Sequence, residues 1–264
     1  MQREPVRERI PSYTVMRECL RRQSATADRG TAARVFGQSP LNPEVRGWYR
    51  GALGEVEVVG ELGRLGDEWT VLHAVPLSSS TSEVDHLAIG PGGLYAITTR
   101  NPSGQRVVVM GGTVRVDGRP TDFIRIARDE AERAATSLGR ALGEAVEVRP
   151  VIVIIDPAST SRRPSSVAVL ESGEVCAWLL NQPIVHSDGA VARIATAAET
   201  PATWRDCPLV DDQAESPEAS FAVLRSEVDA ARSRARGWIV LALTAVLGAL
   251  GVGALALSNL LSVT

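Results

Sequence analysis

The chain has 264 residues, 44% of them apolar, and its 31 acidic and 28 basic side chains leave a net charge of −3. This length allows a sizeable buried core and predicts one main domain with appendages. The charge gives no bulk electrostatic reason to expect nucleic-acid binding. The cysteines are odd in number and widely spaced, which argues against a disulfide framework and a zinc site; they are Cys19, Cys176 and Cys207.

The beginning of the chain is rich in arginine. Residues 1–50 carry ten arginines against five acids, and residues 1–44 show little hydrophobic periodicity and contain Gly30, Pro40 and Pro43. We therefore expect residues 1–44 to form a flexible, solvated arm, whose arginines are also a weak signal for binding a polyanion.

A helix and three strands are predicted after this arm. Ala52, Val56 and Val59 give residues 45–65 an apolar stripe of helical spacing. Glu55 lies at the border of the stripe, where a carboxylate is either a surface residue or a member of an acidic site. Apolar runs rich in β-branched residues then predict strands over residues 69–76, 84–89 and 94–100.

The last two of these strands form a predicted hairpin. Gly90-Pro91-Gly92-Gly93 fits a type II turn, in which Gly92 would take a positive φ. If Gly90 pairs with Gly93, Asp85 falls opposite Thr98, and Arg100 lies on the same face as Thr98. The hairpin would thus bring together an acid, a hydroxyl and a cation. His86, next to Asp85, is expected to be a packed or hydrogen-bonded residue.

The remainder of the main domain alternates helices and strands. We expect a second hairpin at residues 106–110 and 113–116, a helix from Thr121 or Asp122 to Leu142, strands at 151–155 and 167–170, and a helix at 190–198. This order predicts an α/β sandwich with a mixed sheet over residues 45–205.

The end of the chain is apolar. Residues 237–264 contain no charged side chain, and a helix of that length would reach roughly 42 Å, which exceeds a bilayer core of about 30 Å. Arg232, Arg234 and Arg236 precede this segment, and Trp238 suits the membrane interface. We expect a tail anchor in the cell membrane, with the main domain in the cytoplasm and an acidic linker and stalk helix at residues 206–236. Residues 1–20 lack the apolar region of a signal peptide.

Small residues recur every four positions in the predicted span, at Ala245, Ala249 and Gly253. Such spacing lets two membrane helices pack closely, so a homodimer through this face is a weak expectation.

The predicted hairpin and its surroundings resemble a known family. An acid at the start of one strand, a glycine turn, and Glu-x-Lys on the next strand form the pattern of the PD-(D/E)xK nuclease superfamily. Within it, residues 45–155 look like the nuclease-related (NERD) domain. The matching motifs are Gly51-x-x-Gly54-Glu55, Trp69-Thr70-Val71-Leu72-His73, Asp85-His86-Leu87, Gly90-Pro91-Gly92-Gly93 and Thr98-Thr99-Arg100-Asn101. The resemblance implies a restriction-endonuclease-like three-layer α/β/α sandwich.

The chain departs from the family pattern where Glu-x-Lys is expected, because Thr98 and Arg100 stand there and all 28 basic residues are arginine. In the family, the two acids hold a divalent ion and the lysine positions or activates water. Mg²⁺ prefers carboxylate and water oxygens, and arginine stays protonated and cannot act as a base, although it binds phosphate well. We expect a degenerate site of Glu55, Asp85, Thr98 and Arg100, with Asp85 and Glu55 as weak metal ligands.

Three functions remain open from the sequence. The first is a membrane-anchored, catalytically degenerate nuclease-like module that binds nucleic acid or another phosphate-bearing partner, without a cofactor. The second is an active Mg²⁺-dependent endonuclease that uses Glu55, Asp85 and a further ligand such as Glu83. The third is a structural membrane scaffold with a vestigial site.

Overall fold

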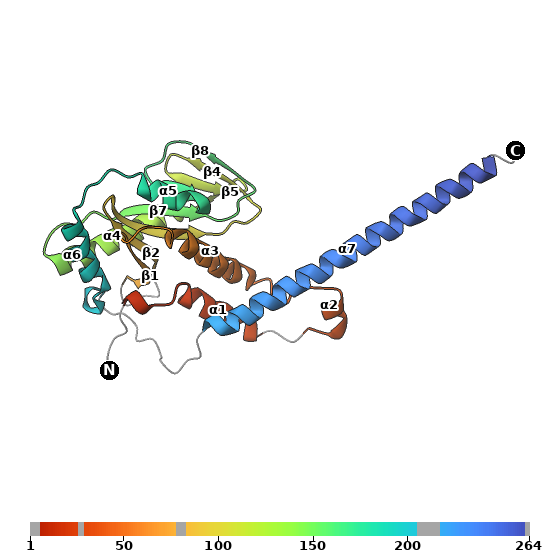
Figure 1. The fold of residues 1–264 in the computed structure, drawn as a ribbon, viewed down its shortest axis with the longest axis horizontal. Helices are drawn as coiled ribbons and strands as arrows, with labels where there is room; N and C mark the ends of the chain where they lie inside the picture. The colour runs from red at the N-terminus through yellow and green to blue at the C-terminus, as the bar shows by residue number, and fades with distance from the viewer. Residues whose placement is uncertain (1–5, 26–28, 78–82, 205–216, 262–264) are drawn as a thin grey trace. The chain divides into compact units, whose positions relative to one another are not determined.

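The computed structural model describes residues 6–25, 29–77, 83–204 and 217–261, and the chain divides into two compact units (Figure 1). The α/β unit comprises Met1–Glu18 and Gly47–Glu215, and the helical unit comprises Cys19–Arg46 and Ser216–Thr264. Cys207 and the predicted acidic linker at residues 206–216 lie outside the described residues.

A five-stranded mixed sheet forms the centre of the α/β unit, in the order β1-β2-β3-β7-β9. The first three strands are antiparallel neighbours, whereas β3, β7 and β9 run parallel. The strands are β1 (Thr70–Pro76), β2 (Glu83–Gly90), β3 (Gly93–Arg100), β7 (Arg149–Ile154) and β9 (Ala168–Glu171). Each lies within a few residues of a predicted strand, because apolar β-branched runs mark buried strands well.

Helices cover both faces of this sheet, which confirms the predicted three-layer α/β/α arrangement. One face packs against α3 and α5, through Val58 and Val175 among others. The other face packs against α4 and α6, through Leu138 and Ile194 among others. The helices are α3 (Arg46–Leu62), α4 (Phe123–Leu142), α5 (Val175–Leu180) and α6 (Asp188–Glu199), and short 3₁₀ turns are η1 (Val6–Glu8), η2 (Ser172–Glu174) and η3 (Pro201–Thr203).

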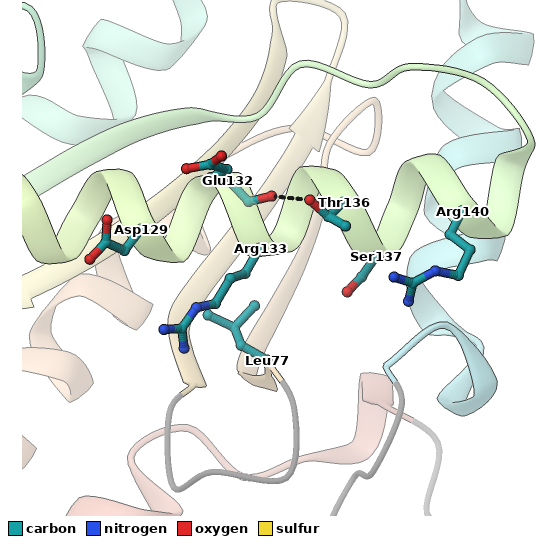
Figure 2. A pocket seen from close by; sticks show the side chains of 7 residues that line it. All are labelled: Leu77, Asp129, Glu132, Arg133, Thr136, Ser137 and Arg140. Carbon is teal, nitrogen blue, oxygen red and sulfur yellow. Dashed lines mark hydrogen bonds between the residues drawn. The ribbon is translucent and has the colours of Figure 1, made fainter.

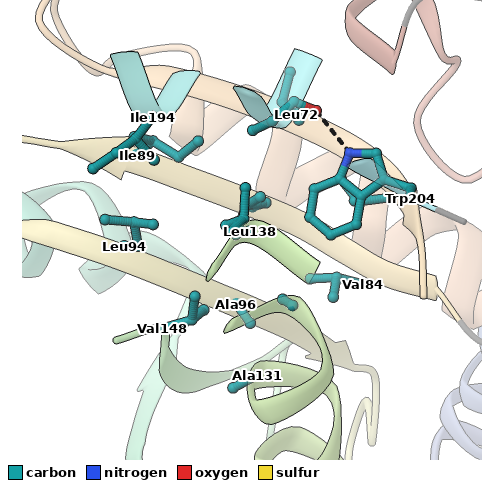
Figure 3. Packing of buried hydrophobic residues seen from close by; sticks show 14 of the residues in the cluster. Leu72, Val84, Ile89, Leu94, Ala96, Ala131, Leu138, Val148, Ile194 and Trp204 are labelled. Atoms are coloured by element: carbon teal, nitrogen blue, oxygen red, sulfur yellow. Dashed lines mark hydrogen bonds between the residues drawn. The ribbon is translucent and has the colours of Figure 1, made fainter. Parts of the chain in front are cut away.

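The cluster between the sheet, α4 and α6 is apolar, and Trp204 brings an indole N–H into it. Trp204 is 1% exposed, and its Nε1–H donates to the Ala198 carbonyl oxygen at 2.7 Å (Figure 3). Leu138 lies in the same cluster and is fully buried. The indole therefore contributes its large apolar area without leaving a polar group unpaired.

A second sheet of four strands has the order β6-β5-β4-β8. The predicted hairpin at its centre is confirmed, and the short strands β6 and β8 were not predicted. Alternate valines, such as Val107 and Val114, face a core shared with α4 and β7. The strands are β4 (Arg106–Met110), β5 (Thr113–Val116), β6 (Arg119–Thr121) and β8 (Ser159–Arg162).

The prediction of a flexible arm over residues 1–44 is wrong for much of that segment. It contains η1, α1 (Tyr13–Ser24) and α2 (Thr31–Val35). Met16 and Cys19 are buried three residues apart on α1, so a narrow apolar stripe is present despite the arginines between. Burial raises the pKa of the Cys19 thiol to about 11.

The helix α7 (Pro217–Leu261) covers both the predicted stalk and the predicted span without a break. The part of α7 that was predicted as a stalk helix has one buried stripe, which consists of Phe221, Leu224, Val228 and Ala231. From residue 239 its described side chains are exposed. Among the described residues, α7 is the one helix long and apolar enough to cross a membrane, which suggests membrane association.

Candidate functional site: a carboxylate cluster at the open end of the β2–β3 hairpin

The β2–β3 hairpin has the predicted register, with Gly90 paired to Gly93 and His86 to Ile97. Its turn is not type II, because Gly93 (φ 131°) has the positive φ and Gly92 does not. Packing explains the glycine at position 92, since a Cβ there would lie 2.8 Å from the Gln182 side chain.

Asp85 lies where the pairing of β1 with β2 is interrupted. The ladder pairs His73 with His86 and resumes at Val75 with Val84, and between them Ala74 takes a φ of 48°. This irregularity changes the alternation of side chains, which a regular strand would maintain. Arg9 occupies the break, because its Nη1 donates to the Ala74 carbonyl oxygen at 2.9 Å.

The Asp85 carboxylate is held from two sides. Its Oδ2 accepts a hydrogen bond from the Thr99 backbone N–H at 2.6 Å and lies 3.8 Å from Nη1 of Arg100. Burial raises the pKa of Asp85, and the Arg100 charge and the Thr99 hydrogen bond oppose that shift. The predicted proximity of Asp85 and Arg100 is therefore found.

Thr98 makes a contact that was not predicted. Its hydroxyl donates to Oε2 of Glu130 on α4 at 2.6 Å, and both residues are buried. The pKa of Glu130 is raised to about 7, by burial first and then by the Asp85 charge, and the hydrogen bond from Thr98 opposes this shift. The threonine thus stands at the expected glutamate position, and a carboxylate from a neighbouring helix lies against it.

One signal in the sequence points to Glu130, which is not among the predicted site residues. Glu130 is 8% exposed and lies on the same buried face of α4 as Ala127, Ala131 and Ala134. A carboxylate within an apolar helical stripe is rarely buried without a partner, so its position alone made it a candidate.

Glu55 and Glu83 join the same electrostatic cluster. Glu55 on α3 is 6% exposed; its pKa is raised well above the usual value by burial and then by the Asp85 charge. The pKa of Glu83 is raised by the same two causes in the same order, and its Oε2 accepts a hydrogen bond from the Thr14 hydroxyl at 3.0 Å. Glu55 is therefore a buried carboxylate whose pKa responds to the Asp85 charge, and it is not a surface residue.

Arg100 is the cation within this cluster. Its Nη1 donates to the Thr99 carbonyl oxygen at 2.7 Å, and its guanidinium lies 5.5 Å from the centre of the Phe123 ring. Together with the 3.8 Å approach to Asp85, these contacts hold the guanidinium against the protein's own acceptors.

The histidines that are far apart in sequence form a pair across β1 and β2. The Nδ1 atoms of His73 and His86 are 2.9 Å apart, so one nitrogen must donate and the other accept. Burial lowers the pKa of both imidazoles, and the His73 charge lowers that of His86 further. His86 is thus a hydrogen-bonded strand residue, as expected.

Comparison with protein families identifies the segment that carries this cluster. Residues 50–155 match the model of the nuclease-related domain (NERD) family. The match covers less than half of the chain, and it includes α3 from residue 50 on, the β2–β3 hairpin and α4. Comparisons with curated proteins and with solved structures gave no match.

The match to the nuclease-related domain model raises the question of whether the acidic residues in the matched segment fit a divalent ion. The donors are of the right chemical class, since carboxylate oxygens are what Mg²⁺ prefers. However, no group of three His, Cys, Asp or Glu side chains within the described ranges is arranged to hold a metal ion. Arg100 also lies against the Asp85 oxygen that a cation would need. The residues, as arranged, do not fit a divalent ion.

A surface pocket of about 460 Å³ lies along α4 (Figure 2). Its lining contains none of the predicted site residues, and Leu77 is the last described residue before the gap at 78–82. The lining residues are Leu77, Asp129, Glu132, Arg133, Thr136, Ser137 and Arg140. This pocket is not part of the carboxylate cluster.

Proposed function

We propose that the chain is a membrane-anchored, nuclease-related protein that binds nucleic acid without cleaving it. The single observation that supports the proposed loss of cleavage is the position of Arg100, whose Nη1 lies 3.8 Å from Oδ2 of Asp85. In this proposal the guanidinium neutralises the aspartate that would otherwise hold a catalytic ion.

Chemistry supports this assignment. Hydrolysis of a phosphodiester by a metal nuclease needs an ion that lowers the pKa of bound water. A guanidinium carries one positive charge and stays protonated at any pH the protein meets. Unlike a metal ion, it does not coordinate a water molecule and lower its pKa. With Asp85 neutralised in this way, the site lacks the means to generate hydroxide.

Binding of nucleic acid requires another surface, because the carboxylates around Arg100 would repel phosphate. The outer face of the second sheet is suited to this role. Val107, Val109, Val114 and Val116 point inward, so Arg106 on β4 and Arg115 on β5 point outward by strand alternation, and both are exposed. Arg163 follows β8 and is also exposed. Arginines on an open sheet can contact phosphates without reading bases.

Membrane anchoring by α7 is the remaining part of the proposal. The apolar side chains at residues 239–251 are exposed, and Arg232, Arg234 and Arg236 precede them. The positive-inside rule then places the α/β unit in the cytoplasm, with α7 as a tail anchor in the cell membrane.

One observation favours a second candidate, a Mg²⁺-dependent endonuclease. The hydrogen bond between Glu130 and Thr98 brings a carboxylate to the position where the family pattern has a strand glutamate. If Arg100 left Asp85, then Asp85, Glu130 and Glu55 would supply the oxygen ligands. The metal would supply a polarised water, and the carboxylates would hold it.

An assay of nucleic-acid cleavage distinguishes the two candidate functions. The full chain in lipid nanodiscs should leave supercoiled and linear DNA, and RNA of the same sequence, intact in Mg²⁺ or Mn²⁺. Cleavage that is lost in both Asp85→Asn and Glu130→Gln would establish the endonuclease and refute the proposal.

Binding is tested in the same nanodiscs with fluorescent DNA and RNA oligonucleotides. The double variant Arg106→Gln/Arg115→Gln should bind more weakly and should reduce the slope of log K against log salt by about two, because about one counterion is released per phosphate contact. Arg193→Gln on α6, an exposed arginine paired with Glu144, is the matched control and should change neither. Absence of binding at low salt would leave the scaffold as the remaining function.

A further inference from the structure

The helical unit exposes apolar side chains beside the start of the candidate membrane span. Val35 at the end of α2 is 49% exposed, Phe36 is 55% exposed, and Trp238 on α7 is 43% exposed. The Phe36 and Trp238 ring centres are 5.2 Å apart. We call these three residues the apolar collar; Figure 1 shows α2 beside α7.

Three further contacts fix the collar to α7. Trp238 Nε1–H donates to the Val35 carbonyl oxygen at 2.9 Å. Gly37 has a φ of 71°, and a Cβ at this position would collide with the Ala231 carbonyl oxygen and the Ala235 nitrogen. Arg29 Nη2 lies 3.4 Å from Oε2 of Glu227. A segment some 200 residues away in the chain is therefore held at one level of the helix.

The position of the collar identifies its partner. Immediately beyond Trp238, Ile239, Val240 and Leu241 are each about 60% exposed, and they begin the stretch that the proposed function places in the bilayer. Side chains at the level of Trp238 would then meet the boundary between headgroups and acyl chains, where tryptophan is favoured.

Charge agrees with this placement. Arg34 precedes Val35 on α2, and Arg232, Arg234 and Arg236 lie within two turns of Trp238 on α7. Basic side chains next to an apolar patch suit an anionic lipid surface, and they would oppose burial of the same patch between two copies of this chain.

We infer that residues 29–38 form a second membrane anchor, in which Val35 and Phe36 insert beside Trp238 into the interfacial layer of the bilayer. This inference rests on the proposed function, because it requires α7 to span the membrane. It adds that the protein contacts lipid through a segment that is not part of the span.

The test places a fluorescent NBD label at one of three positions in the full chain. The variants are Phe36→Cys, Val223→Cys and Val246→Cys, with Cys176 and Cys207 replaced by serine; Cys19 is retained because burial and its pKa of about 11 make it slow to react. Proteoliposomes contain phosphatidylcholine and about a quarter phosphatidylglycerol as the anionic lipid. Iodide measures access from water, and lipids with a quencher near the headgroup or deep in the acyl chain measure depth.

We expect the label at 36 to be quenched by the shallow lipid probe at least about twofold more than the label at 223, and to be shielded from iodide. Val223 is exposed on α7 well before the span, so its label should remain in water. If the label at 36 is quenched to the same extent as the label at 223, while the label at 246 is quenched by the deep probe, the inferred insertion of the collar is refuted and the proposed membrane span stands. A label at 246 that stays in water refutes the span itself. Shielding of position 36 from both iodide and lipid would show a protein partner and also overturn the inference.

Two glycine variants provide a second test of the inference, in case labelling at residue 36 disturbs the collar. Gly37→Ala should detach residues 29–38 from α7, because its Cβ meets backbone atoms. Gly30→Ala is the matched control, since a Cβ at Gly30 meets nothing within 4 Å. Hydrogen exchange of residues 31–36 in proteoliposomes should become faster in Gly37→Ala only, and lipid should protect these amides in the unmutated chain. Equal exchange with and without lipid in the unmutated chain contradicts the inference.

Discussion

The β2–β3 hairpin has a closed end, at Gly90–Gly93, and an open end, at Asp85 and Thr98–Arg100. At the closed end the contacts are aromatic and apolar: Tyr95 lies between Trp69 and Trp178, and its hydroxyl donates to the Gly92 carbonyl oxygen at 2.6 Å. At the open end the contacts join carboxylates, a hydroxyl and a guanidinium.

The two ends differ in what burial does to stability. Apolar side chains gain free energy when they leave water, at roughly 25 cal/mol per Å². Buried carboxylates lose hydration, which the raised pKa values of Glu55, Asp85 and Glu130 express. The closed end therefore stabilises a ribbon whose open end is unfavourable by itself, as is common where side chains are retained for function. Four substitutions test this contrast, from the largest expected effect to the smallest.

Leu94→Ala should cause the largest decrease in the free energy of unfolding. Leu94 is 1% exposed in the core beneath the closed end, and removing such a side chain leaves a cavity that costs about 3 kcal/mol. Urea unfolding of the full chain in detergent, followed by tryptophan fluorescence, measures the change. Leu180→Ala, at an exposed position of α5, should cost less than about 0.5 kcal/mol; an equal loss in both variants would contradict the assignment of the core.

Gly90→Ala should cost about 2 kcal/mol because of overpacking. A Cβ at Gly90 would collide with the Trp69 ring. Gly112→Ala is the control, because a Cβ there meets nothing within 4 Å. A neutral Gly90→Ala would mean that Trp69 can move aside, and that the closed end is less tightly packed than described.

Glu130→Gln should stabilise the protein at pH 8 by about 1–2 kcal/mol, since it removes a buried charge and keeps an acceptor for Thr98. The folded pKa of about 7 is above the usual value of 4.5, so the stability linked to this group is full below pH 4.5 and is lost as pH rises through 7. The gain should therefore disappear near pH 4.5. A gain that is equal at both pH values would show that charge is not its cause.

His73→Asn should change the unfolding free energy least. The stability linked to this histidine pair is lost as pH falls, whereas the stability linked to Glu130 is lost as pH rises. Because burial lowers both histidine pKa values, the unfolded chain binds more protons below about pH 6.5 and the pair destabilises the fold as pH falls. The variant removes one titrating ring, so its unfolding free energy should decline less between pH 7 and pH 5. An unchanged slope would mean that the pair does not titrate in this range.

Local patterns in the sequence determined much of this fold. The strands of the hairpin, its register and the buried face of α4 follow from side-chain periodicity within about twenty residues. The apolar segment after Trp238 was evident from composition alone. These features depend on neighbours along the chain, and a pattern of period 2 or 3.6 is visible without any partner.

Tertiary structure decided the chemistry of the site and the environment of the span. Thr98 meets Glu130 because α4 packs across β3, and His73 meets His86 because β1 pairs with β2. Ala74 breaks the alternation of β1 beside Asp85, and Val35 lies against Trp238, some 200 residues away. Each of these contacts joins segments whose approach depends on strand order and helix packing, and local periodicity carries no information about either.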